Sequence, residues 1–336
     1  MSSVILRLDD GRTERVELAE RDRIDSSLFE GRDDIIGAII PAGVTTIGES
    51  AFAGCTSLAS VTIPEGVKSI GDGAFFGCSS LTSLTISVGV LIIENGAFEG
   101  CSSLVSVTIP EGVTTIGAFA FGQCSSLASV IIPESVTTIE AYAFFDCTLL
   151  ASVTIPSGVR TIGVSIFEGC ESLVSVTIPE GVTTIAEYAF RLCTSLTSLT
   201  IPEGVTTIRE NAFSYCTSLQ QVAIMDPMAQ IESHSFSNCN RINQVSIHDS
   251  VTIIFPGDEE KNLRQLYQGR AAWEHVFPTC PAEHIKWPTS LREEYEAGFV
   301  DRATTITTLA SLLSRSVPRE VIAEITGLQA GDFRRE

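Results

Sequence analysis

A cysteine recurs every 23 residues through the middle of this chain. Nine cysteines follow one another at this spacing without an insertion, and only Cys280 stands outside the series. The series consists of Cys55, Cys78, Cys101, Cys124, Cys147, Cys170, Cys193, Cys216 and Cys239. Self-similarity at a fixed period of about 20–50 residues is the signature of a repeat architecture. The spacing therefore predicts a stack of equivalent coils rather than one globular core.

Apolar residues keep the same period. Phe recurs from Phe52 to Phe236 without a gap, and Ile recurs from Ile47 to Ile254. A single coil buries too little apolar surface to offset the conformational entropy lost when 23 residues become ordered, so coils should be stable only when stacked. We expect the inner ladder of this stack to include Cys101, Cys124, Cys147, Phe98, Phe121, Phe144, Ile116 and Ile139.

The residue pattern within one coil predicts a short strand followed by turns. In the coil that begins at Cys101, residues 104–109 fit a strand in which Val107 and Ile109 face inward. Pro110 should end that strand, and the following glycine should open a turn. The segment around Phe121 should form a turn or a single helical turn on the outer side. The predicted fold is an α/β-type repeat solenoid with a parallel β ladder and short turns or helical turns outside it.

The consensus Leu-x-x-Val-x-Ile-Pro-x-x-Val-x-x-Ile-Gly-x-x-Ala-Phe-x-x-Cys resembles the BspA-like class of leucine-rich repeats over roughly 220 of the 336 residues. The resemblance implies a leucine-rich-repeat-like solenoid that serves protein binding or adhesion, and it implies no catalytic residues. The chain departs from the general leucine-rich repeat at one position. The usual Asn, nine residues after the first Leu, is replaced by Val67 and Val113 in two of the coils. The ladder of Asn side chains is therefore missing.

Three segments follow from these patterns. Residues 1–34 should form an N-terminal β-hairpin cap that turns at Asp10 and Gly11. Residues 35–255 should form the solenoid of about nine to ten coils. Residues 256–336 begin with a proline-rich irregular stretch and end in a helical pattern, which predicts a C-terminal cap or tail.

The net charge of −20 limits the possible partners. Residues 35–249 hold five basic and 18 acidic side chains. Because nucleic acids and anionic membranes are bound through Lys and Arg, neither is expected as a partner. No apolar stretch is long enough for membrane insertion. The sequence also shows no signal peptide, so we expect a cytoplasmic protein, with the cell surface as the second possibility.

Residues with catalytic or metal-binding chemistry are scarce. The chain has four His, none in a regular coil, and it contains no P-loop, dinucleotide-binding or nucleophile-elbow motif. The repeated cysteines should act as small buried apolar groups rather than as disulfides or metal ligands. The cluster of His275, Cys280 and His284 matches no zinc spacing. We expect no enzyme activity, cofactor or metal, and an enzyme with a site in this C-terminal region stays as an alternative.

Two exposed columns could serve recognition. The first, here called the Ser/Thr face, is the outward side of the strands and includes Ser106, Thr108, Ser129, Ser152, Thr154, Ser175 and Thr177. The second, here called the acidic ridge, follows the strands and includes Glu111, Glu134, Glu180 and Glu203. Either column could equally be a solvated strand face or a charged edge that keeps the array soluble.

The predicted function is a non-catalytic protein-interaction module, or scaffold, that presents both columns to a protein partner with a basic segment. The alternative is a surface protein that serves adhesion, as the family resemblance implies, or ice or crystal binding, as the regular Ser-x-Thr spacing suggests. The sequence leaves the oligomeric state open.

Overall fold

The computed structural model describes residues 2–226, 229–232, 234–247, 252–254 and 285–286, with backbone alone for residue 247 and the last two of these ranges. All of them belong to the first of the chain's two compact units, Met1–Lys286. The helical segment predicted near the C-terminus lies outside the described residues. Described residues form strands and turns, and none of them forms a helix.

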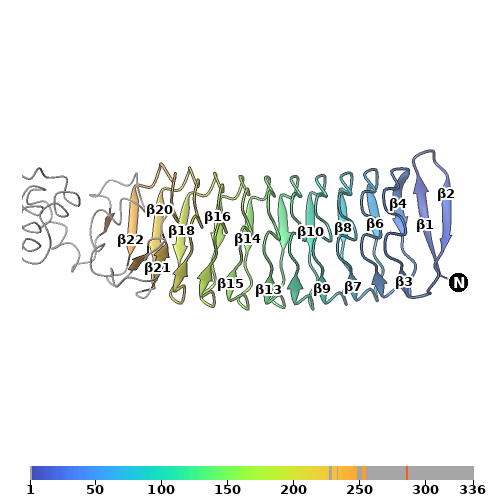
Figure 1. Ribbon diagram of the computed structural model, residues 1–336, viewed down its shortest axis with the longest axis horizontal. Helices are drawn as coiled ribbons and strands as arrows, with labels where there is room; N and C mark the ends of the chain where they lie inside the picture. Colours follow the sequence, from blue (N-terminus) through green and yellow to red (C-terminus); the bar gives the residue numbers. More distant parts are fainter. Residues whose placement is uncertain (1, 227–228, 233, 248–251, 255–284, 287–336) are drawn as a thin grey trace, which may run out of the picture. The chain divides into compact units, whose positions relative to one another are not determined.

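Each coil contributes one strand to each of two faces of the solenoid, so strands that are alternate in sequence are neighbours in space (Figure 1). The strands of the first face are β4 (Ile35–Ile39), β6 (Ser60–Thr62), β8 (Ser83–Thr85), β10 (Ser106–Thr108), β12 (Ser129–Ile131), β14 (Ser152–Thr154), β16 (Ser175–Thr177), β18 (Ser198–Ile201), β20 (Gln221–Ile224), β22 (Gln244–Ile247) and β24 (Ile285–Lys286).

The second face is built from shorter strands. They are β3 (Arg23–Ile24), β5 (Thr46–Ile47), β7 (Ser69–Ile70), β9 (Ile92–Ile93), β11 (Thr115–Ile116), β13 (Thr138–Ile139), β15 (Thr161–Ile162), β17 (Thr184–Ile185), β19 (Thr207–Ile208), β21 (Gln230–Glu232) and β23 (Thr252–Ile254). The strands pair in parallel within each face. Each face is divided into two successive sheets, which run from β4 to β16 and from β18 to β24 on the first face, and from β3 to β13 and from β15 to β23 on the second.

Strand register follows the 23-residue period. Ser106 pairs with Ser83 on one side and with Ser129 on the other. On the second face, Thr115 pairs with Thr138. Because successive coils up to β22 have the same length, their equivalent residues lie side by side. The last step on the second face is one residue shorter, so Ile231 pairs with Ile253 and not with Ile254, the residue at which the Ile column was predicted to end. The parallel solenoid predicted from the cysteine spacing is confirmed.

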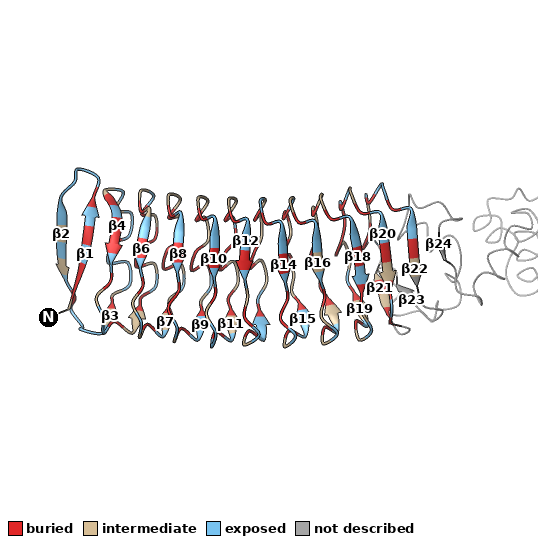
Figure 2. Ribbon diagram, turned by 180° about the vertical axis from the view of Figure 1, so that it is seen from behind, coloured by how far each residue is buried: buried red, intermediate tan, exposed pale blue. Residues whose placement is uncertain are grey.

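The core is a set of side-chain ladders that run along the stack. The Phe column is fully buried, and successive rings from Phe29 to Phe236 stack with centroids 4.8–5.6 Å apart. Val107 and Ile109 face inward, as predicted, and Figure 2 shows the alternation of buried and exposed residues along the strands. Phe29 adds one ring to the Phe column before Phe52, the residue at which this column was predicted to begin.

The outer segment of each coil forms turns, so the helical turn considered from the sequence is wrong. In the segment around Phe121, the N–H groups of Phe119, Phe121 and Gln123 donate to carbonyls of the next coil over 2.6–3.1 Å. The N–H groups of Ala120 and Gly122 donate to carbonyls three residues earlier. An α-helix would use all these donors within one coil and leave the neighbouring coil unpaired. The positive φ angles of Phe119 (56°) and Gln123 (57°) also interrupt any helix.

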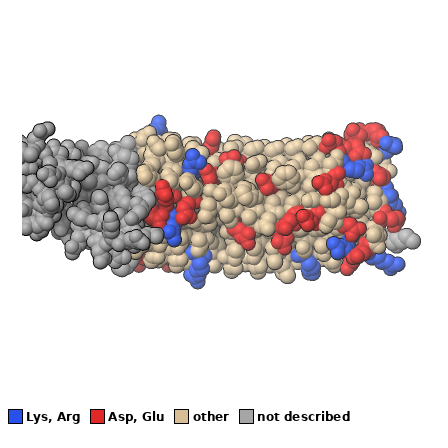
Figure 3. All heavy atoms as spheres, viewed as in Figure 1, with Lys and Arg blue, Asp and Glu red and all other residues tan. Residues whose placement is uncertain are grey.

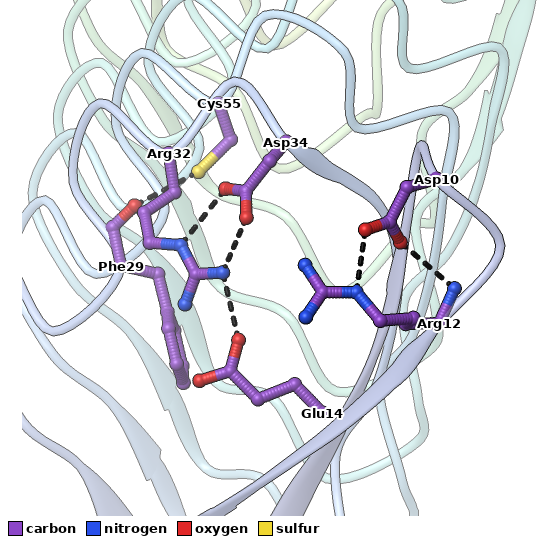
Figure 4. A network of polar contacts seen from close by, with 7 residues as sticks. All are labelled: Asp10, Arg12, Glu14, Phe29, Arg32, Asp34 and Cys55. Carbon is purple, nitrogen blue, oxygen red and sulfur yellow. Dashed lines mark hydrogen bonds and ion pairs between the residues drawn. The ribbon is translucent and has the colours of Figure 1, made fainter.

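An antiparallel hairpin precedes the coils. Strand β1 (Ser3–Leu8) pairs with β2 (Thr13–Glu17) on one side and with β4 on the other. Arg32 joins this hairpin to the first coil, because its guanidinium contacts Glu14 of β2 at 2.7 Å and both oxygens of Asp34 at 2.6 and 2.9 Å (Figure 4). Side-chain hydrogen bonds to Arg32 lower the pKa of the Asp34 carboxyl group. Antiparallel pairing by β1 occupies the edge of β4 that would otherwise be open to another chain.

Candidate protein-binding surface

The Ser/Thr face lies on the outer side of the first-face strands. In β6, β8, β10 and β14, the first and third residues are exposed and the middle residue is buried. The predicted residues Ser106, Thr108, Ser129, Ser152, Thr154, Ser175 and Thr177 are all exposed. In-register pairing places Ser152 beside Ser175 and Thr154 beside Thr177. The fold therefore brings these residues into continuous rows, with a strand spacing of about 4.8 Å.

Exposed apolar side chains interrupt this polar face. Ile131 takes the place of a Thr in its row and is 63% exposed, and it pairs with Thr108 of the neighbouring coil. Val105 and Val174, each immediately before a strand, are about half exposed. These residues were missed from the sequence because only the repeating Ser and Thr positions of the strands were considered. The column before each strand, where Val occurs among Ala and Thr, was left out. They add apolar contact area to an otherwise polar surface, and burial of such area favours association.

The acidic ridge is exposed at Glu65, Glu111, Glu134, Glu180 and Glu203. Val88 and Ser157 occupy the same column, so the ridge is interrupted twice. The Ser157 N–H and hydroxyl donate to Glu134 Oε2 at 3.0 and 2.8 Å, and these bonds lower the pKa of Glu134. At the far end, Asp226 is buried and accepts a bond from the Gly204 N–H at 2.7 Å. Glu134 and Asp226 thus join neighbouring coils as well as carrying charge.

The remaining ridge carboxylates make no ion pair in the part of the chain that the structure describes, although Arg160 lies near Glu180 and donates to the Gly181 carbonyl at 3.1 Å. Glu65, Glu111, Glu180 and Glu203 form no ion pair there. On the face shown in Figure 3, acidic side chains are scattered over the middle coils, whereas Lys and Arg show near the ends and along the lower edge. An unpaired row of exposed carboxylates creates a negative potential that attracts a basic partner segment.

The cysteine column is structural. All nine thiols are buried, and each donates to the carbonyl of the Phe 26 residues earlier, with Sγ···O distances of 3.0–3.4 Å. The first of these bonds, from Cys55 to Phe29, is drawn in Figure 4. Burial raises the pKa of Cys55 to about 11 and raises the pKa of Cys78 further. A protonated, inaccessible thiol is neither a nucleophile nor a metal ligand.

Other candidate chemistry does not gather in the described coils. Among residues that the structure describes, no three His, Cys, Asp or Glu side chains are grouped so as to hold a metal ion. His275, Cys280 and His284, on which the alternative of a C-terminal enzyme site depends, lie outside the described residues. None of the described segments forms a helix that could cross a membrane.

Comparisons with known proteins agree with this architecture. The family model described as the BspA type leucine-rich repeat region matches six copies over residues 22–151 and 137–257. A search of curated proteins finds no match. Among solved structures, a leucine-rich repeat protein from Bacteroides ovatus is similar to this chain with 24% identity and a TM-score of 0.59, covering 76% of this chain and 77% of that one.

Two further solved structures are similar at lower TM-scores. A leucine-rich cell surface protein from Faecalibacterium prausnitzii is 26% identical, with a TM-score of 0.44 and coverage of 82% of this chain and 96% of that one. A leucine-rich repeat protein from T. pallidum is 28% identical, with a TM-score of 0.39 and coverage of 59% and 71%.

Proposed function

Because the chain belongs to the family of BspA-type leucine-rich repeat proteins, we propose that its solenoid is a non-catalytic module that binds a protein partner. The family suggests protein interaction in general terms. We propose further that the partner contacts the Ser/Thr face and that a basic segment of the partner lies along the acidic ridge.

The observation that carries this proposal is the composition of the exposed strand rows. Small hydroxyl side chains are exposed along β10, β12 and β14 in successive coils. Ile131 and Val105 stand out from them as exposed apolar groups, and Glu111 lies beyond the end of β10. A partner would find apolar contacts, hydrogen-bonding hydroxyls and a negative edge within one surface. This combination is typical of a protein interface, which joins an apolar centre to a polar rim.

The test is a pull-down from source cells at low and high salt, followed by affinity measurements with the captured partner. Replacing Glu111, Glu134, Glu180 and Glu203 with Gln should reduce retention at low salt, because the charge attraction is lost. Replacing Ile131 with Thr restores the ordinary residue of its row and should weaken binding by about 1 kcal/mol.

Glu187→Gln is the matched control, because it removes a carboxylate that belongs to neither surface. It should bind as the native chain does. Retention that is independent of salt and unaffected by the four ridge substitutions would count against the acidic ridge. An unchanged affinity for Ile131→Thr would count against the Ser/Thr face.

A further inference from the structure

A shallow groove of about 400 Å³ lies on the turn segments that follow β3, β5, β7, β9 and β11, and none of its lining residues belongs to the Ser/Thr face. It arises because one turn position loses its side chain in two successive coils. This position is Phe119 and Tyr142 in later coils but Gly73 and Gly96 in earlier ones. All four residues have similar left-handed backbones, with φ of 56–62°. The backbone of the turn is therefore similar in all four coils, and Gly73 and Gly96 differ only in lacking a side chain.

The ring of Phe119 closes one end of this groove. Phe119 and Tyr142 stack with centroids 4.5 Å apart and planes within 1° of parallel. Tyr142 thus covers one face of the Phe119 ring. On the other side, the equivalent position of the preceding coil is Gly96, which offers no ring to stack on Phe119. The face of an aromatic ring attracts a cation.

Carboxylates surround the cavity beside this ring. Glu99 lies over the missing side chain, because a Cβ atom placed on Gly96 would be 3.3 Å from Glu99 Oε2. Burial raises the pKa of Glu99 above its ordinary value. Glu30, Glu49 and Asp72 also line the groove.

None of these four carboxylates forms an ion pair with a described residue, and no Lys or Arg lines the groove. The half-exposed ring of Phe76 adds an apolar wall. A negative cavity with two aromatic rings and no internal cation is complementary to a positively charged, partly apolar ligand.

We propose that this groove is a second binding site, which receives an extended, arginine-bearing segment of a protein partner. A guanidinium is planar, so it can stack on the face of Phe119 opposite Tyr142 while its edge donates to Glu99. The groove spans four coil steps from Glu30 to Phe119, and each step is about 5 Å, as the spacing of the buried Phe rings shows. An extended chain rises about 3.3 Å per residue, so roughly six residues fit.

The probe is a fluorescently labelled hexapeptide with blocked ends that contains two arginines among glycines. Its partner peptide carries citrulline, which has nearly the same shape as arginine but no charge. Binding is measured by fluorescence anisotropy at low salt. The native chain should bind the arginine peptide about tenfold more tightly than the citrulline peptide, since the ion pair and the cation–π contact are lost together.

Two substitutions locate the site. Gly96→Phe fills the cavity with the side chain that the next coil carries at a similar φ, and it should weaken binding about tenfold or more. Glu99→Gln removes one charge without changing the shape of the side chain, and it should also weaken binding, so the test does not depend on Gly96→Phe being folded. Circular dichroism and thermal melting confirm folding of both variants.

Control variants separate this site from the surface proposed above. Glu187→Gln, at the column position of Glu49 and Asp72 but outside the groove, should bind the arginine peptide as the native chain does. Glu111→Gln, on the acidic ridge, should also leave this binding unchanged. Absence of arginine-peptide binding, equal affinity for the citrulline peptide, or native affinity in both Gly96→Phe and Glu99→Gln would overturn the proposal.

Discussion

At the scale of single residues, the repeated cysteine joins successive coils. Its thiol donates to a Phe carbonyl of the preceding coil in each of nine coils. The thiol is a weak donor, but it is small enough to lie beside the stacked Phe rings. The chain lacks the Asn ladder of general leucine-rich repeats, and these S–H···O bonds supply inter-coil contacts in its absence. Because burial disfavours the charged thiolate, these cysteine side chains resist ionisation.

Stability should fall as pH rises above about 9. The pKa of every thiol from Cys55 to Cys216 is raised by burial, from a reference of 9.0. Between 9.0 and the raised pKa, the unfolded chain loses the thiol proton and the folded chain keeps it. Ionisation therefore favours unfolding, and the full stability of the stack is present only below pH 9. Each thiol contributes up to about 1.4 kcal/mol per pH unit.

Guanidinium unfolding curves recorded from pH 7 to about pH 10.5 check this expectation. Cys147→Ala, which removes one ionisable thiol, should reduce the slope of unfolding free energy against pH above pH 9 relative to the native chain. A free energy of unfolding that stays constant across this range would contradict the assignment of the thiols to a buried ladder.

A second residue-scale prediction concerns Asp146, which has a left-handed backbone with φ of 53° where earlier coils have Gly77 and Gly100. Its carboxylate lies against the next coil, because a Cβ on Gly169 would meet Asp146 Oδ1. Burial, with Glu168 and Glu171 nearby, raises the pKa of this carboxyl group. Asp146→Gly should remove backbone strain and repulsion together, and it should raise the free energy of unfolding by about 1 kcal/mol.

Denaturant unfolding of Asp146→Gly measures this change, and Gly100→Ala is the reverse control. Gly100 has φ of 72°, so an added Cβ is strained there and should lower stability by about 1 kcal/mol. A destabilised Asp146→Gly variant would show that the carboxylate makes a favourable contact which outweighs the strain.

The sequence could predict which residues face inward, but not these local geometries. The inward position of the cysteines follows from their apolar neighbours in the repeat. Their hydrogen-bond acceptor lies 26 residues away, in the preceding coil, so the pattern within a coil does not reveal it. Left-handed backbones at Phe119 and Tyr142 are also unexpected, because bulky residues rarely adopt them. The groove beside Gly96 depends on that conformation and therefore could not be predicted from the sequence.

At the scale of the element, the repeating unit is the coil, and it is stable only when it is stacked on its neighbours. A strand such as β11 has two residues and could not persist alone. Its stability comes from parallel pairing with β9 and β13 and from ladders that continue through every coil. The prediction of a helical turn was wrong because alternate N–H groups of the outer segment donate to carbonyls of the next coil. The secondary-structure propensities of residues within one coil do not reveal these bonds between coils.

The effect on unfolding of replacing a Phe of the column with Ala should therefore depend on the position of that Phe along the stack. Phe144→Ala removes a ring between Phe121 and Phe167 and should cost about 3–5 kcal/mol. It also weakens the interface between two halves of the array, so unfolding should split into two transitions. Phe29→Ala, at the first rung, should fray that end and leave a single main transition.

Calorimetry with each variant distinguishes these outcomes. The heat of unfolding should divide between two peaks in Phe144→Ala and stay largely in one peak in Phe29→Ala. Identical melting profiles for the two variants would contradict a stack in which each coil is stabilised by its nearest neighbours.

At the scale of the whole molecule, repetition turns one short motif into an extended surface. The described coils repeat one motif, and small variations among them distinguish one part of the surface from another. Ile131 changes the Ser/Thr face, Ser157 interrupts the acidic ridge, and Gly73 and Gly96 open the groove. The 23-residue register could be predicted from the sequence because the coils up to β22 carry no insertion, whereas the final step to β23 is one residue shorter. The proposed binding properties depend on departures from the repeat, which the 23-residue period does not reveal.

The most direct test of this account is the removal of one whole coil. Deleting residues 152–174 joins Ala151 to Ser175 and keeps every column in register, whereas deleting residues 152–162 does not. Thermal unfolding monitored by circular dichroism should show that the 23-residue deletion folds cooperatively, with a melting temperature near that of the native chain. The 11-residue deletion should lose the β-sheet spectrum or melt far lower. If the 23-residue deletion unfolds like the shorter one, the chain is not a stack of equivalent coils.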